Sequence, residues 1–193
     1  MTGKPNRLRS VGRVGQAVDR FYAELREAPE KGRMVAWCDG FPLPFPIIRA
    51  AGVEYFFGDA YAATVSARHQ EKELQKVAED HGYIVEVCSY TRSTMGCALF
   101  PEERAADALP IWLMPKPDFI VATDPGCSML VNWADDERRR FNVPMFVLQF
   151  HHVWYEDEEE EALADTTRQL AEFVTFLEDV THRRFNWERL RQI

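Results

Sequence analysis

Short apolar runs alternate with segments of helical periodicity along this chain, and the alternation constrains its fold more than any other feature. Four of the runs have the length and residue types of strands; they span 34–38, 53–57, 118–123 and 143–148. A regular exchange of strands and helices is typical of α/β proteins. The sequence therefore predicts an α/β fold with a largely parallel, Rossmann-like sheet flanked by helices.

Amphipathic helices are predicted around these strands. Apolar side chains recur at helical spacing through residues 14–28: Val14, Ala17, Val18, Phe21, Tyr22 and Leu25. Further helices are expected at 47–51, through most of 60–80, and at 101–109, 128–141 and 158–181. We expect an N-terminal helical segment over 1–31, an α/β domain that carries the cysteines over 32–155, and C-terminal helices over 156–193.

Charge and hydropathy restrict the class of partner. The 193 residues carry a net charge of −8, whereas nucleic-acid binding calls for a basic face. No apolar run approaches the roughly 18 residues of a membrane span, and residues 1–13 lack the apolar core of a secretory signal. We therefore expect a cytoplasmic protein with no nucleic-acid and no membrane partner, in which four cysteines serve as thiols or metal ligands.

Cys88 and Cys127 hold equivalent positions in the sequence. Each follows an apolar run, 83–87 or 118–123, and each is followed by Ser and an expected helix start or turn. Both are thus predicted at carboxyl ends of strands, where parallel sheets bind ligands. A helix N-terminus also favours an anionic thiolate. Two interpretations stay open on spacing alone: a cluster ligand, or a small buried residue, since the pair is 39 positions apart with no CxxC motif.

Three stretches together resemble the 2-hydroxyacyl-CoA dehydratase and benzoyl-CoA reductase family. They are "GRMVAWCDGFPLPFPIIRAAGVEYFFGDAY", "VEVCSYTRSTMGCALF" and "KPDFIVATDPGCSMLVNWADDERRRFNVPMFVL". Their order and spacing are similar to the amino-terminal part of a family subunit of the 2-hydroxyglutaryl-CoA dehydratase D-component type. The resemblance runs from about residue 32 to residue 150.

The resemblance implies a specific chemistry. Family subunits hold a [4Fe-4S] cluster through three cysteines, and Cys88 and Cys127 match the first two of these positions. An ATP-dependent activator protein supplies one electron at low potential, which passes to an acyl-CoA thioester and forms a ketyl radical. Dehydration follows in the dehydratases and ring reduction in the aryl-CoA reductases. A second subunit of the dehydratase or reductase is the implied partner.

The sequence also departs from the family pattern. Family subunits are longer, and the third cysteine position has no counterpart here; Cys97 is a weak candidate, while Cys38 is expected in the core. A fragment, a domain or a shortened subunit that another chain completes would each fit. A non-catalytic α/β scaffold or interaction subunit that has lost the complete cluster is the alternative function.

Two further groups of residues are weaker candidates. Arg92 and Ser93 follow Cys88 and could contact the cluster or a thioester, or lie in a surface loop. His151 and His152 with Glu156 could bind a metal, but spacing alone does not fix a site and a solvated turn is the favoured interpretation.

Overall fold

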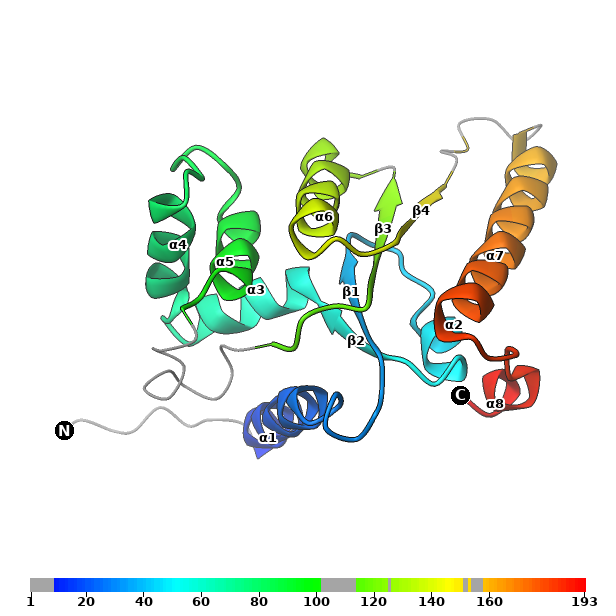
Figure 1. Ribbon diagram of the computed structural model, residues 1–193, viewed down its shortest axis with the longest axis horizontal. Helices are drawn as coiled ribbons and strands as arrows, with labels where there is room; N and C mark the ends of the chain where they lie inside the picture. The colour runs from blue at the N-terminus through cyan, green and yellow to red at the C-terminus, as the bar shows by residue number, and fades with distance from the viewer. Residues whose placement is uncertain (1–8, 102–113, 125, 151–152, 154–157) are drawn as a thin grey trace.

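A four-stranded, entirely parallel sheet forms the centre of the molecule (Figure 1). The computed structural model describes residues 9–101, 114–124, 126–150, 153 and 158–193. The strands lie in the order β2-β1-β3-β4; they are β1 (Val35–Asp39), β2 (Glu54–Phe57), β3 (Phe119–Asp124) and β4 (Met145–Gln149). The predicted α/β fold is confirmed, and each strand lies within two residues of its expected bounds.

The register of the central strands explains why their sequences are apolar without interruption. Trp37 of β1 lies opposite Phe56 on one side and Ile120 on the other, and these three side chains enter the same core. The next residue, Cys38, lies opposite Val121 and enters the core on the opposite face. Since successive strand residues point to opposite faces, a parallel sheet covered on both sides buries every position.

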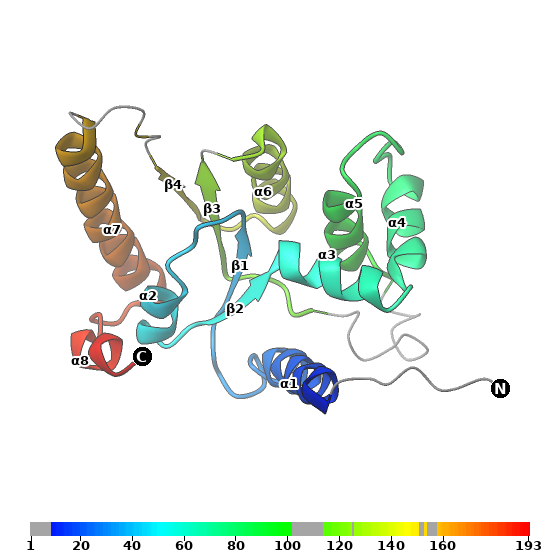
Figure 2. The same ribbon diagram turned by 180° about the vertical axis from the view of Figure 1, so that it is seen from behind.

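Helices cover both faces of the sheet (Figure 1 and Figure 2). One core holds residues from α1 (Arg9–Arg26), α3 (Gly58–Ala67) and α6 (Ser128–Phe141). The other holds residues from α2 (Phe45–Ala50), α7 (Glu159–Thr181) and α8 (Trp187–Gln192). Within the described ranges, none of these helices is long and apolar enough to cross a bilayer.

An antiparallel helix pair extends the fold beyond the sheet. It consists of α4 (Glu71–Asp80) and α5 (Ser89–Ala98), and it packs against α3 (Figure 1). A Cβ atom at Gly96 of α5 would overlap the backbone carbonyl of Leu74 in α4. The two helices therefore approach as closely as they do because residue 96 is glycine.

The structure corrects the expected strand at residues 83–87. This segment is the loop between α4 and α5, closed by hydrogen bonds from Tyr83 N to Ala78 O and from Val87 N to Ile84 O. The close packing of α4 on α5 leaves only eight residues between Asp80 and Ser89, so the segment links neighbouring helices and does not reach the sheet. Cys88 thus follows a loop and not a strand.

Two other expectations about helices have different outcomes. The helix expected over most of 60–80 is divided into α3 and α4 by a turn at residues 68–70, where His69 adopts a left-handed conformation with φ of 56°. The helix expected at 101–109 lies, apart from residue 101, outside the described residues.

Candidate functional site

The strand order creates a topological switch point between β1 and β3. From β1 the chain passes through α2 on one face to reach β2, whereas from β3 it passes through α6 on the other face to reach β4. In open parallel sheets, ligands bind outside the carboxyl ends of the strands at such a point. The starts of α5 and α6 lie at this same end of the molecule (Figure 1).

Cys127 lies directly at this switch point. It follows the carboxyl end of β3 and is the N-cap residue of α6, with extended backbone angles of −80° and 124°. Its thiol is exposed. The first amide groups of a helix lack intrahelical partners, so an anionic ligand held by Cys127 would face the favourable end of the helix dipole.

Cys88 occupies the equivalent position on α5. It is the N-cap residue of that helix, its carbonyl oxygen accepts a hydrogen bond from Arg92 N at 3.0 Å, and its thiol is exposed. The structure thus presents both thiols at helix N-termini on the same side of the molecule as the carboxyl ends of the strands (Figure 1).

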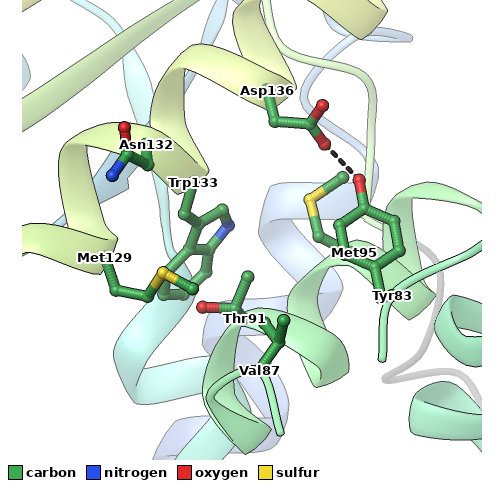
Figure 3. A pocket seen from close by; sticks show the side chains of 8 residues that line it. All are labelled: Tyr83, Val87, Thr91, Met95, Met129, Asn132, Trp133 and Asp136. Atoms are coloured by element: carbon green, nitrogen blue, oxygen red, sulfur yellow. Dashed lines mark hydrogen bonds between the residues drawn. The ribbon is translucent and has the colours of Figure 1, made fainter. Parts of the chain in front are cut away.

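A pocket of about 140 Å³ lies between α5 and α6, and its lining begins in their first turns (Figure 3). Thr91 is the third residue of α5 and Met129 the second residue of α6. The lining consists of Tyr83, Val87, Thr91, Met95, Met129, Asn132, Trp133 and Asp136. Asp136 accepts a hydrogen bond from the Tyr83 hydroxyl at one side of the pocket.

Arg92 and Ser93 contact α4 and the backbone around the start of α5. Both are buried on α5: Arg92 forms an ion pair with Glu79 of α4 and donates to the Val87 carbonyl at 3.1 Å. Ser93 donates to the Ser89 carbonyl at 2.8 Å and accepts from Gln75 of α4. They lie in a helix and not in a surface loop, and they fix α5 to α4.

The two remaining cysteines lie in the core. Cys38 is fully buried in the sheet, as expected, and burial raises its pKa well above the ordinary value. Cys97 is buried on α5, where desolvation raises its pKa to about 11 although a hydrogen bond with Tyr61 opposes the shift. It lies nine positions after Cys88, about 13 Å along the helix axis. The structure therefore does not bring Cys97 to the exposed thiols.

The described ranges contain no group of three or more His, Cys, Asp or Glu side chains arranged to hold a metal ion. The histidine pair 151–152 and Glu156 lie outside these ranges. Cys88 and Cys127 do not by themselves make up such a group within the described residues.

A buried acid pair beneath the switch point was not anticipated from the sequence. Asp39 ends β1 and Glu137 lies in α6, and each is at most 1% exposed. Burial raises the pKa of Asp39 to about 7 and that of Glu137 well above its ordinary value. Glu137 Oε1 accepts from Trp133 Nε1 at 2.6 Å, whereas Asp39 Oδ2 and Glu137 Oε2 are buried with no other hydrogen-bond partner. A proton on Glu137 that is donated to Asp39 satisfies both oxygens. The pair therefore retains a proton at neutral pH.

The sequence signal for this pair was weak. Glu137 stands within "ADDERRRF", a stretch whose other charges lie on the surface of α6. Asp39 directly follows an apolar strand, and this position was the one hint that its carboxylate is buried.

Comparison with known proteins identifies the family. A family model described as "2-hydroxyglutaryl-CoA dehydratase, D-component" matches residues 43–193. The (R)-2-hydroxyisocaproyl-CoA dehydratase alpha subunit of Clostridioides difficile is 26% identical over 175 residues, covering 89% of this chain and 40% of the relative. The lactoyl-CoA dehydratase subunit alpha of Anaerotignum propionicum is 25% identical, covering 88% of this chain and 42% of the relative.

A third relative extends the range of named substrates. The (R)-2-hydroxyglutaryl-CoA dehydratase subunit alpha of Acidaminococcus fermentans is 20% identical, covering 94% of this chain and 52% of the relative. The chain thus spans about half or less of the length of these curated relatives. Because the family model matches most of its residues, the chain belongs to the 2-hydroxyglutaryl-CoA dehydratase D-component family.

Proposed function

We propose that this chain is the iron–sulfur part of a 2-hydroxyacyl-CoA dehydratase subunit, in which Cys88 and Cys127 provide two ligands of a [4Fe-4S] cluster. One observation carries the proposal: the two exposed cysteines are the N-cap residues of α5 and α6, two helices that start at the same end of the molecule and line one pocket. Membership of the dehydratase family supports it.

The donor chemistry of the site fits such a cluster. Iron–sulfur clusters are bound through cysteine thiolates, and two helix N-termini would face the negative charge of the cluster and its ligands. The third ligand of the family pattern belongs downstream of the cysteines matched here, and we assign it to a segment or subunit outside the described residues. Cys38 and Cys97 are buried in the core and are not assigned to the ligand set.

When bound, the cluster supplies a single low-potential electron to the thioester of a 2-hydroxyacyl-CoA. The residues of this chain then have three tasks: the two thiols anchor the cluster, the pocket between α5 and α6 orients the acyl group, and the walls of the pocket exclude water. We propose dehydration and not ring reduction, because the relatives cited above are named as dehydratases. An ATP-dependent activator is the proposed electron donor.

A second subunit is the proposed partner at this end of the molecule. Phe41, in the loop after β1, is 74% exposed, and Ile84, in the loop before Cys88, is 62% exposed. Tyr90, in the first turn of α5, is 40% exposed. Large apolar side chains gathered around a reactive centre indicate a protein interface, and a bound subunit would also shield the cluster from water and oxygen.

A non-catalytic scaffold or interaction subunit is the alternative function. The incomplete ligand set within the described residues favours it. The two functions predict different effects when a thiol is removed. A scaffold would still bind its partner and the complex would keep its turnover, whereas the enzyme would lose turnover.

The test measures turnover of a 2-hydroxyacyl-CoA without oxygen, with the partner subunit and the activator present. We expect Cys88→Ala and Cys127→Ala each to abolish dehydration while leaving partner binding intact. Cys38→Ala is the matched control, since it removes a buried thiol and should lower stability with little effect on turnover. Full turnover in both exposed-thiol variants would establish the alternative.

A further inference from the structure

We propose that the pocket between α5 and α6 binds the acyl side chain of the substrate and selects an apolar side chain over one that ends in a carboxylate. The inference rests on the proposed function and names the substrate class of the same site. Four features of the pocket carry it: its size, its lining, its charge and its distance from the two exposed thiols.

The size fits a small hydrocarbon group. The pocket offers about 140 Å³, and an apolar protein cavity of about 150 Å³ holds one benzene molecule. A branched four-carbon side chain or a phenyl group therefore fills it. A methyl side chain would leave most of it empty and would gain little from burial.

The lining presents carbon and sulfur to an occupant (Figure 3). Val87, Met95 and Met129 contribute aliphatic and thioether groups. Trp133 contributes its ring, while its indole N–H donates to the buried Glu137 at 2.6 Å and is not available to a ligand. Flexible thioethers adapt to the outline of an apolar guest. Thr91 and Asn132 add polar groups to the lining, and the Asn132 amide donates to the Ser128 carbonyl at 3.0 Å within α6.

The charge of the pocket opposes an acidic side chain. Asp136 is its only charged lining residue, and its carboxylate accepts a hydrogen bond from Tyr83 at one wall. Arg140 offsets part of this charge, because it approaches Asp136 at 3.8 Å and donates to the Tyr83 hydroxyl at 3.2 Å, but it is not part of the lining. A carboxylate in the pocket would therefore lose its hydration with no cation in the described lining to replace it, which favours neutral side chains.

The position suits a substrate that reacts beside the thiols. Thr91 follows Cys88 by three residues and Met129 follows Cys127 by two residues, so the lining begins within about 5 Å of both N-caps along the helix axes. In a 2-hydroxyacyl thioester the side chain begins at the carbon next to the carbonyl and hydroxyl groups. A thioester carbonyl at the thiols thus directs its side chain between α5 and α6.

Binding of two thioesters to the full chain tests the inference without iron. The probes are the N-acetylcysteamine thioesters of 2-hydroxy-4-methylpentanoate and of 2-hydroxyglutarate, followed by NMR of ¹³C-methyl methionines. We expect the first probe to shift the signals of Met95 and Met129 and not that of Met34, which packs in the opposite core. We expect it to bind about tenfold more tightly than the acidic probe.

Two variants of one loop provide the matched control. Val87→Phe fills the pocket and should weaken binding of the apolar probe about tenfold or more. Val85→Phe makes the same change at a side chain that is 64% exposed and outside the lining, and should leave the affinity unchanged. Asp136→Asn removes the charge, keeps an acceptor for Tyr83 and should reduce the preference against the acidic probe.

Equal affinities for the two probes, or wild-type affinity in Val87→Phe, would overturn the inference. The same titration in a Cys88→Ser, Cys127→Ser double variant separates it from the proposed function. Selective binding there, together with an unaltered cluster in single cysteine variants, would leave the pocket established and the ligand assignment wrong. If the cluster depends on both thiols and neither probe binds, the ligand assignment stands and the pocket is not the side-chain site.

Discussion

Replacing Glu137 by glutamine should make the stability of this protein less dependent on pH. In the native structure the Glu137 carboxyl group donates to Asp39 and accepts from Trp133 Nε1. Glutamine has the same length, keeps the acceptor for Trp133 and places an amide donor where the carboxyl proton was. The change therefore removes a titration and leaves the packing and both hydrogen bonds in place.

The sign of the effect follows from the raised pKa values. Burial raises the pKa of Asp39 from 3.8 to about 7 and that of Glu137 well above 4.5, so the folded protein holds protons that the unfolded chain releases. The stability from these groups is fully present below about pH 4 and is lost as pH rises through 7. At about 1.4 kcal/mol per pH unit, the shift of Asp39 alone corresponds to at most about 4 kcal/mol.

The free energy of unfolding, measured by urea titration from pH 5 to pH 9, tests this reasoning. We expect wild type to lose more than the ~2–4 kcal/mol that the Asp39 shift accounts for over this range. Asp39 still titrates in Glu137→Gln, so this variant should lose only the Asp39 part and be the more stable protein at pH 8. Glu172→Gln is the control, because Glu172 lies on the surface of α7 and is 54% exposed. If the unfolding free energies of wild type and Glu137→Gln change with pH in parallel, Glu137 does not hold a buried proton in the folded protein.

Three further variants and one control test the helix pair and the proposed interface. Gly96→Ala should lower the unfolding free energy by about 2–4 kcal/mol, because its new methyl group meets the Leu74 carbonyl. The control Gly12→Ala, on the open surface of α1, should raise the unfolding free energy by up to about 1 kcal/mol. Thermal unfolding measures both variants. Arg92→Met should cost about 1–3 kcal/mol in the same assay, since it breaks a largely buried ion pair. Ile84→Asp should abolish co-purification of the partner subunit without a change in melting temperature; retention of the partner would exclude this loop from the interface.

The central sheet could be predicted because each strand is buried on both faces. Residues 34–38 and 119–122 are apolar without interruption for that reason, and their covering helices carry clear periodicity. The place of Cys127 followed from the same logic, since residues after a parallel strand lie at one edge of the sheet.

The surroundings of Cys88 could not be predicted in the same way. Residues 83–87 have the composition of a strand, yet the packing of α4 on α5 makes them a loop. Arg92 also looked like a surface residue, because nothing nearby in the sequence announces its partner Glu79, thirteen positions earlier. The pairing of Asp39 with Glu137 spans about half the chain and depends on how α6 crosses β1. Such contacts arise from tertiary packing and leave no local pattern.

The iron and sulfide content of the reconstituted chain tests the central claim most directly. The measurement compares wild type with Cys88→Ala, Cys127→Ala and Cys38→Ala, prepared without oxygen and with the partner subunit present, together with the visible absorbance of each. We predict about four iron and four sulfide per wild-type chain and per Cys38→Ala chain, and almost none in the other two. A wild-type cluster in Cys88→Ala and in Cys127→Ala would contradict the assignment of both ligands.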